Sequence, residues 1–476
     1  MNRPIVRLFG VVVVMFAALI AFTSRWTVFE ASALRENREN ARPLLEQERI
    51  PRGAILAADG TVIARSVRGA EGTYERLYPT GSLFAHPVGY YYLTPGSSGL
   101  ERSRNAQLAG LTVSGLQSIL NQLQGVKPSG DTVVTTLQPA AQRLAEQALA
   151  GHRGAIVALD PRTGAVTVMA SAPSFDPRAF SSQKGIEELD RRGEGALVNR
   201  ATQDGYTPGS TFKVLTATAA IDTGAFTPES TLSGRNGIPV SGVPLDNDQH
   251  ESFGQITLTK ALALSVNTVW AQVAERLGKR TLARYMDRFG FDREPQLDYP
   301  SREMSISAEY SHGAPIPPTS EEVDVGRMGI GQDKLEVTAL QMAQVASAVA
   351  DRGTLMVPHL TQRVVNSEGA TVQRIRPRVQ SHVMKRSTAE AVTRMMEAVV
   401  NEGTGTPAQI PGVQVAGKTG TAETQLGNAP NNAWFIAFAP ASHPRVAVAV
   451  TLQDVPGYGA TYAAPVAREL IERLLK

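Results

Sequence analysis

The 476-residue sequence contains no cysteine. This absence excludes disulfide bonds, thiolate metal ligands and a cysteine nucleophile, and it leaves any covalent chemistry to serine, threonine, lysine or a carboxylate. The seven histidines are widely scattered and no His-Glu-x-x-His motif occurs, so a local zinc signature is missing as well. We therefore expect neither a metal nor another cofactor.

A strong excess of charge of either sign is also missing. Lysine and arginine total 47 against 44 aspartates and glutamates, giving a net charge of +3. This charge is too small to indicate a nucleic-acid partner without a local basic cluster, which the sequence lacks. No internal repeat or low-complexity tract stands out. The length is sufficient for two or three domains.

An apolar run lies near the N-terminus, at residues 8–22. Arg3 and Arg7 precede it, which is typical of an export segment with a cytoplasmic N-terminus. The run is short for a membrane span, although flanking residues extend it, and a cleaved signal peptide is the alternative. The A-x-A candidate at residues 31–33 lies farther from the run than cleavage usually allows. We therefore expect a single-pass, uncleaved anchor over residues 1–25, with the rest of the chain outside the cytoplasm.

Residues 26–150 are mixed in character and rich in turns. The patterns predict a charged helix over residues 32–48, a hairpin around the Asp59-Gly60 turn, and a further helix over residues 138–149. These patterns indicate structure rather than catalysis. We expect a small extracytoplasmic α/β domain here, a pedestal beneath the main domain.

The main domain is expected over residues 151–476. Its first part has a strand, turn, strand pattern, and two apolar strand-like runs lie near its end. Strands at both ends of a helical middle predict an α+β domain. The predicted strands cover residues 154–170, 433–439 and 445–452, and the predicted helices cover residues 212–221, 256–264, 268–277, 338–352, 388–400 and 466–475.

One turn and helix carry a candidate catalytic pair. Pro208 and Gly209 form a turn, and the apolar run after them predicts a buried helix with Ser210 in its first turn and Lys213 one turn further on. Residues three apart share a helix face, so the hydroxyl and the amine can meet near the positive end of the helix dipole. The pattern indicates a serine nucleophile beside a lysine base. A capping serine with a solvated lysine is the alternative for any lone S-x-x-K.

A second S-x-x-K motif occurs at Ser181 and Lys184. Gly185 follows at once, and the next turn is polar, with Glu187, Glu188 and Asp190. A surface segment has this pattern, so we exclude the second motif as a catalytic pair.

Two further clusters follow Ser210 in the chain. Ser265 and Asn267 form an S-x-N motif between two apolar helical runs, and Lys418-Thr419-Gly420-Thr421 follows a strand-like run. Each cluster alone is usually a helix cap or a strand end. The order of all three motifs on one chain favours a shared site instead. The other S-x-N, at residues 103–105, precedes Ser210 and does not fit this order.

In this order the three motifs strongly resemble those of the serine penicillin-recognising enzymes, and the chain most resembles the class B penicillin-binding proteins, in particular their actinobacterial members. The resemblance implies a penicillin-binding transpeptidase fold, shared with serine β-lactamases, in which helices flank an antiparallel sheet. It extends over nearly the whole chain. Besides the anchor and the three motifs, it includes the Arg52-Gly53 hairpin, Gly99-Leu100-Glu101, Gly331-Gln332, residues 416–423 and Ala433-Trp434-Phe435.

The sequence departs from the family pattern in two places. The region before residue 151 is shorter than in many class B members, and the hairpin has Ala57-Ala58-Asp59 where the family usually has an Asp-Arg pair. Both departures concern contacts with partners more than catalysis.

The resemblance implies a D,D-transpeptidase that cross-links peptidoglycan. Ser210 would attack the penultimate D-Ala of a stem peptide, with Lys213 as the base and Asn267 holding that lysine. Ser265 would relay a proton to the departing D-Ala, and Lys418 would keep the site positive. Thr419 and Thr421 would bind the terminal carboxylate, Gly420 would let the substrate lie close to the strand, and the backbone N–H groups of Ser210 and Thr421 would form the oxyanion hole.

The same resemblance implies the partners. These are stem peptides and glycan strands derived from lipid II, β-lactam antibiotics as mimics of D-Ala-D-Ala, the cytoplasmic membrane, and a polytopic lipid II polymerase of the SEDS class. The acceptor amine and the physiological role, whether in elongation, division or sporulation, are not encoded in the motifs.

Other functions share parts of the pattern. A β-lactamase would need a water-activating group, and residues 294–298 superficially resemble the E-x-x-L-N of class A enzymes, but Asp298 replaces the asparagine. A D-Ala-D-Ala carboxypeptidase, with water as acceptor, stays open because no motif encodes the acceptor. A non-enzymatic β-lactam sensor or inert cell-wall scaffold is the third alternative. The intact motifs argue against an inert scaffold, and we expect a sensor to need a cytoplasmic signalling module, for which the few residues before Leu8 leave no room. The stretch before residue 151 is too short for an additional glycosyltransferase domain.

Overall fold

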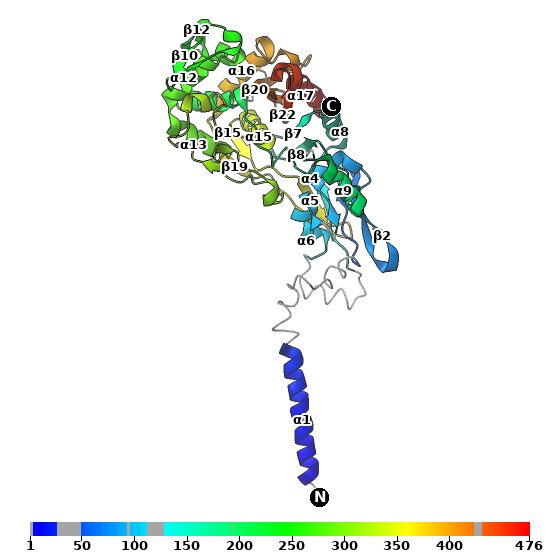
Figure 1. The fold of residues 1–476 in the computed structure, drawn as a ribbon. Helices are drawn as coiled ribbons and strands as arrows, with labels where there is room; N and C mark the ends of the chain where they lie inside the picture. Colours follow the sequence, from blue (N-terminus) through cyan, green and yellow to red (C-terminus); the bar gives the residue numbers. More distant parts are fainter. Residues whose placement is uncertain (1–2, 26–48, 93–95, 112–127, 194, 423–430) are drawn as a thin grey trace. The chain divides into compact units, whose positions relative to one another are not determined.

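The computed structural model describes residues 3–25, 49–92, 96–111, 128–193, 195–422 and 431–476 (Figure 1). The chain divides into a unit of residues 1–51 with 67–75 and a larger unit of residues 52–66 with 76–476. The helix predicted over residues 32–48 and the A-x-A candidate at residues 31–33 lie outside the described residues.

The N-terminal unit contains helix α1 (Arg3–Ser24), which has 22 residues and is longer than the predicted apolar run. At the usual rise per residue it is about 33 Å long, similar to the hydrocarbon core of a bilayer. An 18-residue window within Arg3–Thr23 has a mean hydropathy of 2.7, and none of it is buried in the protein. Helix α1 is therefore a candidate membrane span.

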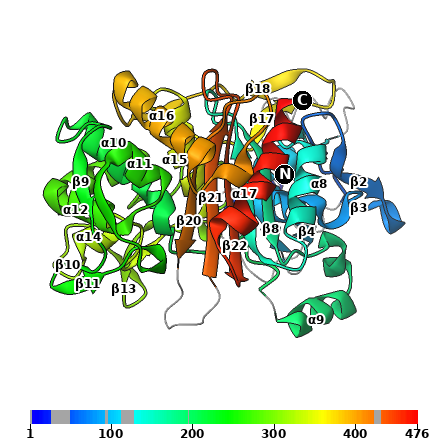
Figure 2. The same ribbon diagram turned by 90° about the horizontal axis from the view of Figure 1, so that it is seen from above.

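The centre of the larger unit is an antiparallel five-stranded sheet in the order β20-β21-β22-β7-β8 (Figure 2). The strands predicted near residue 160 and near residue 440 are neighbours in this sheet, since β7 pairs with β22. This pairing confirms the prediction that strands from both ends of the domain enclose a helical middle. The strands are β7 (Arg153–Leu159), β8 (Val166–Ala172), β20 (Ala416–Ala422), β21 (Asn431–Ala439) and β22 (Val446–Val455).

Helices cover both faces of this sheet. Alternate residues of a strand point to opposite faces, and in β22 the side chains of Val448 and Val450 enter one hydrophobic core while those of Ala447 and Ala449 enter the other. Helices α8 (Pro139–Ala148) and α17 (Gly459–Leu475) pack on the first face, and α15 (Ala339–Ala350) packs on the second. Because both faces are buried, the strands read as continuous apolar runs.

The helical middle confirms the helices predicted from the sequence, with shifted ends. Thr257 and Thr338 cap the starts of α11 and α15, because their hydroxyls accept hydrogen bonds from the N–H groups of Lys260 and Gln341. The predicted helices are α10 (Lys213–Asp222), α11 (Leu258–Ala263), α12 (Asn267–Leu277) and α16 (Arg386–Glu402), whereas α13 (Lys279–Phe289) was not predicted.

Short elements around these helices were not predicted. Two of them pair antiparallel close to the site, β9 (Thr231–Gly234) with β12 (Phe253–Thr257). The others are α4 (Ala85–Val88), α5 (Gly99–Ser103), α6 (Asn105–Leu108), α9 (Gln183–Arg192), α14 (Val325–Met328), β4 (Tyr91–Tyr92), β5 (Gly96–Ser97), β10 (Ile238–Val240), β11 (Val243–Leu245), β13 (Ala308–Ser311), β14 (Ala314–Ile316), β15 (Leu335–Glu336), β16 (Thr354–Met356) and β19 (Val379–His382).

A second sheet, of six strands, joins distant parts of the chain in the order β18-β17-β6-β1-β2-β3. The predicted hairpin is present, because β1 pairs with β2 across the Asp59-Gly60 turn. A hairpin from much later in the chain pairs with β6 and extends the sheet. The strands are β1 (Ile55–Leu56), β2 (Val62–Arg68), β3 (Tyr74–Leu77), β6 (Thr132–Thr135), β17 (Thr361–Val365) and β18 (Thr371–Arg374).

Glu101 is the centre of a buried polar cluster beside this sheet. Its carboxylate accepts hydrogen bonds from Arg52 Nε at 2.7 Å and Arg76 Nε at 2.6 Å, and its side chain is 0% exposed. Arg52 also donates to the side chain of Asn105 and lies over the ring of Tyr91. Burial alone would raise the pKa of Glu101, but Arg76 and Arg52 together hold that pKa below its usual value. The cluster explains the Arg52-Gly53 and Gly99-Leu100-Glu101 segments as structural.

We expect Glu101→Gln to lower the free energy of unfolding by about 3 to 5 kcal/mol, because it leaves two buried guanidinium groups without a counter-charge. Glu188→Gln serves as the control, since it removes an exposed ion pair with Arg191 and should cost less than about 1 kcal/mol. Urea denaturation of both variants gives the comparison. Equal losses would contradict the role assigned to the cluster.

Candidate active site

Ser210 lies in a 3-10 turn, Gly209–Phe212, that leads directly into α10. The serine therefore precedes the helix by one turn and does not lie within its first turn as predicted. The φ angle of Gly209 is 53°, and a Cβ atom at this position would lie 2.6 Å from the carbonyl oxygen of Thr421. Gly209 N–H donates to the carbonyl of Gly331 at 2.9 Å. A residue with a side chain would not fit this turn, which places Ser210 beside strand β20.

Lys213 is the first residue of α10 and is 0% exposed. Its Nζ donates to the carbonyl oxygen of Ser265 at 2.7 Å and to Asn267 Oδ1 at 2.6 Å, and Ser265 Oγ lies 3.3 Å away. Burial is the main reason that its pKa lies well below the usual value, and the nearby Lys418 lowers this pKa further. A neutral amine has two protons, which these two acceptors occupy. Its lone pair is then available to a hydroxyl.

Lys418 reaches the same hydroxyl from β20. Its Nζ lies 2.9 Å from Ser265 Oγ and 3.0 Å from the carbonyl oxygen of Thr419. Burial lowers the pKa of Lys418 to about 7. Ser265 Oγ is therefore hydrogen bonded to both lysines, and the three sequence clusters meet at this atom.

Ser265 adopts an unusual backbone conformation between α11 and α12. Its φ angle is 61°, in the left-handed region that residues with side chains rarely adopt. This conformation lets both the carbonyl and the hydroxyl of one residue face Lys213. Strained conformations of this kind are common at functional sites.

Strand β20 packs closely against the Ser210 turn. A Cβ atom at Gly420 would lie 2.7 Å from the carbonyl oxygen of Pro208 and 2.8 Å from Thr211. Gly420 is thus required by contacts within the protein, independently of any substrate. On the same side, Trp434 of the neighbouring strand β21 donates from Nε1 to the carbonyl of Thr207 at 3.1 Å, which holds β21 to the segment that enters this turn.

A cleft of about 640 Å³ opens above these residues. Ser210, Ser265, Asn267, Thr404, Thr419 and Thr421 line this cleft, together with the last two residues of β11 and the loop of residues 246–250 that follows it. We call this loop the rim loop. Tyr458 OH donates to Asp248 Oδ1 at 3.3 Å and so connects the rim loop with the start of α17. All predicted site residues except Lys213, Lys418 and Gly420, which lie beneath, line this cleft.

Several residues that line the cleft were not predicted from the sequence. Thr404 Oγ1 lies 2.6 Å from Thr419 Oγ1, so the two hydroxyls share a hydrogen bond. Asp248, Arg327 and Tyr458 also line the cleft. The Gly403-Thr404-Gly405 turn after a helix was the only local signal for Thr404, and the others had none.

The two motifs that were set aside lie elsewhere. Ser181 and Lys184 are both exposed: Ser181 ends a 3-10 turn and donates to the carbonyl of Arg178, and Lys184 lies in the first turn of α9. Ser103 donates to the carbonyl of Asp298, and Asn105 accepts from Arg52. Neither pair lines the cleft.

The segment that superficially resembles a lactamase motif has a structural role. The carboxylate of Asp298 accepts hydrogen bonds from the N–H groups of Leu360 and Thr361 and pairs with Arg104 at 2.6 Å. It thereby joins α6, the segment after α13 and the start of β17. Neither Glu294 nor Asp298 lines the cleft, so this segment does not place a carboxylate where it could activate water.

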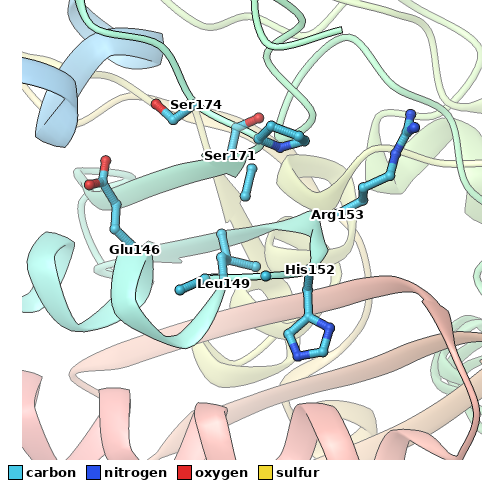
Figure 3. A pocket seen from close by; sticks show the side chains of 10 residues that line it. Glu146, Leu149, His152, Arg153, Ser171 and Ser174 are labelled. Carbon is cyan, nitrogen blue, oxygen red and sulfur yellow. The ribbon is translucent and has the colours of Figure 1, made fainter. Parts of the chain in front are cut away.

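A second cavity, of about 560 Å³, lies between the end of α8 and the adjoining ends of β7 and β8 (Figure 3). Glu146, His152, Arg153, Ser171 and Ser174 line it, and burial raises the pKa of Glu146 to about 7. It contains none of the predicted site residues. Among the described residues, no group of three or more histidine, aspartate or glutamate side chains is arranged to hold a metal ion.

Comparison with known proteins finds a matching family for each of two parts of the chain. Residues 154–472 match the family described as "Penicillin binding protein transpeptidase domain", and residues 52–133 match "Penicillin binding protein A dimerisation domain". The peptidoglycan D,D-transpeptidase PbpA of Mycolicibacterium smegmatis is 34% identical over 501 residues, which cover 100% of this chain and 99% of that protein. The peptidoglycan D,D-transpeptidase MrdA of Escherichia coli is 30% identical, over 81% of this chain and 69% of that protein.

Solved structures resemble the chain as well. The imipenem acyl-enzyme complex of penicillin-binding protein A from M. tuberculosis has a TM-score of 0.80 and 30% identity, and covers 91% of this chain and 100% of that chain. The D,D-transpeptidase domain of a peptidoglycan glycosyltransferase from Eggerthella lenta has a TM-score of 0.78 and 32% identity, and covers 90% of this chain and 98% of that chain.

The chain belongs to the penicillin-binding protein transpeptidase family. Within this family it is a class B penicillin-binding protein similar to the PbpA-type members over its full length.

The lowered pKa of Lys418 predicts that the acylation rate depends on pH differently for ligands with and without a free carboxylate. Because its pKa is about 7, Lys418 loses its charge above neutral pH, so acylation by a penicillin with a free carboxylate should slow there. The methyl ester of the same penicillin lacks the carboxylate and should not show this falling limb. Second-order acylation rates for both ligands across pH test this expectation. The same falling limb for acid and ester would mean that Lys418 acts mainly in proton transfer.

Proposed function

We propose that Ser210 is the nucleophile of a peptidoglycan D,D-transpeptidase and that Lys213, Ser265, Asn267 and Lys418 serve its proton transfers. The family supports the reaction class. The observation that supports this assignment of roles is the joint contact of Lys213 and Lys418 with Ser265 Oγ, directly beneath a cleft lined by Ser210.

Acylation begins when Lys213 removes the proton of Ser210. The hydroxyl oxygen attacks the carbonyl carbon of the penultimate D-Ala, and the bond from this carbon to the nitrogen of the terminal D-Ala breaks. The proton passes through Ser265 Oγ, which contacts both lysines, to the departing amine. Asn267 holds Lys213 during these steps through its Oδ1. An amine from a neighbouring stem peptide then takes the acyl group from Ser210.

The negative charge that develops on the carbonyl oxygen of the substrate needs hydrogen-bond donors. The backbone N–H groups of Ser210 and Thr421 serve as the oxyanion hole, an arrangement usually worth about 3 kcal/mol per donor. Thr419 and Thr421 bind the terminal carboxylate with their hydroxyls, and Lys418 supplies positive charge beneath them. Gly420 lies between these two threonines and keeps the strand close to Ser210.

A D-Ala-D-Ala carboxypeptidase shares every step up to the acyl-enzyme and differs only in using water as the acceptor. The similarity to proteins named D,D-transpeptidases favours the amine. An inert scaffold would not need two buried lysines around one hydroxyl, since burying such groups is costly.

We further propose the organisation and surroundings of the protein. Residues 1–25 anchor the chain in the cytoplasmic membrane with the N-terminus inside, residues 26–150 form the extracytoplasmic pedestal, and residues 151–476 form the transpeptidase domain. The anchor then keeps the cleft on the side of the membrane where stem peptides and lipid II-derived glycan strands lie. A membrane glycosyltransferase of the SEDS class is the proposed partner, and β-lactams are the proposed inhibitors.

Fluorescent penicillin should label wild-type protein on the peptide that contains Ser210, and Ser210→Ala should abolish the label. The variant removes only one half-buried hydroxyl, so it should unfold at the same temperature as the wild type. Ser181→Ala is the matched control and should label normally. A label that maps to Ser181 by peptide mass spectrometry would overturn the assignment.

The anchor predicts that the mature protein retains residues 1–30 and stays with membranes after a high-salt wash. An apolar span is not released by salt, whereas an electrostatic surface attachment is screened. N-terminal sequencing of the mature protein provides the second measurement. A sequence that began near Leu34 would show cleavage after the A-x-A candidate and exclude an anchor.

A further inference from the structure

Asn247 is a buried residue within an otherwise largely exposed rim loop. It is 4% exposed, while Asp246 and Asp248 on either side are exposed. Its Nδ2 donates to the carbonyls of Gly234 at 3.0 Å and Glu251 at 2.9 Å. These bonds fix the rim loop to the end of β9 and to the chain that leads into β12.

The other end of the same amide binds the start of helix α12. Asn247 Oδ1 accepts hydrogen bonds from Thr268 N–H at 3.0 Å and from Thr268 Oγ1 at 3.1 Å. Thr268 follows Asn267 directly. The side chain of Asn247 therefore uses all its hydrogen-bonding capacity to join the rim loop to the S-x-N motif.

The rim loop also decides which way the amide of Asn267 faces. Asn267 Nδ2 donates to the carbonyl oxygen of Asp246 at 3.0 Å, which leaves Oδ1 toward Lys213 Nζ at 2.6 Å. If this amide were turned over, two donors would face each other and Lys213 would lose an acceptor. The residue next to Asn247 thus supplies the contact that orients the ligand of the base.

We propose that Asn247 is a positioning residue for the general base: by fixing the Asp246 carbonyl and the start of α12, it holds Asn267 in the orientation that keeps Lys213 buried and hydrogen bonded. This inference rests on the proposed role of Lys213 as the base. Asn247 does not itself touch the reacting atoms.

The groups around Lys213 determine the direction in which its pKa should change when Asn247 is replaced. The charged groups that act on it are Lys418 from β20, which lowers its pKa, and Asp248 from the rim loop, which raises it, while burial is the largest influence. Releasing the rim loop admits water to Lys213, so its pKa should rise toward the ordinary lysine value. A smaller fraction of the amine is then neutral near pH 7, so acylation should be slower there than in the wild type. This difference in rate should shrink as the pH rises.

The test measures acylation of the full-length protein by a penicillin methyl ester across pH, using intact-protein mass spectrometry. Because the ester has no free carboxylate, the attraction between Lys418 and that carboxylate does not contribute to the measured acylation rate. We expect Asn247→Ala to slow acylation at least about tenfold near pH 7, within the range of general-base catalysis, with the rising limb shifted to higher pH. Asn247→Asp loses both donors to the Gly234 and Glu251 carbonyls and adds a negative charge, so it should shift the rising limb to higher pH as well.

Gln341→Leu is the structural control. Gln341 is 3% exposed, and its Nε2 donates to the carbonyl of Phe289 at 2.9 Å, away from the cleft. This variant should lose stability without any shift of the pH profile. A wild-type pH profile in folded Asn247→Ala, or the same shift in Gln341→Leu, would overturn the proposal.

Two further outcomes are decisive. If Asn247→Ala does not fold, Thr268→Val replaces it, because this variant removes only the Oγ1 contact. It should shift the profile in the same direction by a smaller amount, and an unshifted profile would refute the positioning role. A failure of the proposed function would look different, because the wild-type protein would then not be acylated on Ser210.

Discussion

Lys213 and Lys418 are both completely buried, and both hydrogen bond to the same hydroxyl, that of Ser265. Two charged ammonium groups cannot share such a site at low cost, because burial and mutual repulsion both disfavour the charged forms. Lys213, which has the additional repulsion from Lys418, is held neutral more strongly. The rest of the domain supplies the conditions for this arrangement, namely a helix whose first residue is buried and a sheet with both faces covered.

Much of this arrangement could be predicted because the chemistry lies on regular elements. Lys213 begins an apolar helix and the K-T-G motif falls on a strand, so periodicity and motif order were sufficient to place them, although Ser210 lies in the 3-10 turn before that helix and not in its first turn. The polar turn after Lys184 correctly indicated a surface segment. The strands at the two ends of the domain were recognised from continuous apolar runs. The runs are continuous because both faces of the sheet are covered.

The parts that could not be predicted depend on contacts between distant residues. Asn247 and Thr404 lie in irregular segments without periodicity, and their importance comes from single hydrogen bonds to Thr268 and Thr419. The hairpin β17–β18 joins a sheet whose other strands precede it by more than two hundred residues in the chain. Asp298 is a further case, since its sequence context resembled a catalytic motif while its carboxylate binds the backbone of β17.

The rim loop affects the base in two opposite ways, and their relative size matters for acylation. Its Asp246 carbonyl orients Asn267 and so helps to keep Lys213 dry, which lowers the pKa of the amine, while the charge of Asp248 raises that pKa. Asp248 is exposed, hydrogen bonded to Tyr458 and screened by solvent, so the effect of burial is larger. A ligand that enters the cleft displaces water from this loop and thereby strengthens both effects. Burial acts on the charged amine directly, whereas Asp248 acts only from the rim. A ligand that fills the cleft should therefore favour the neutral form of Lys213 at the moment when Ser210 must lose its proton.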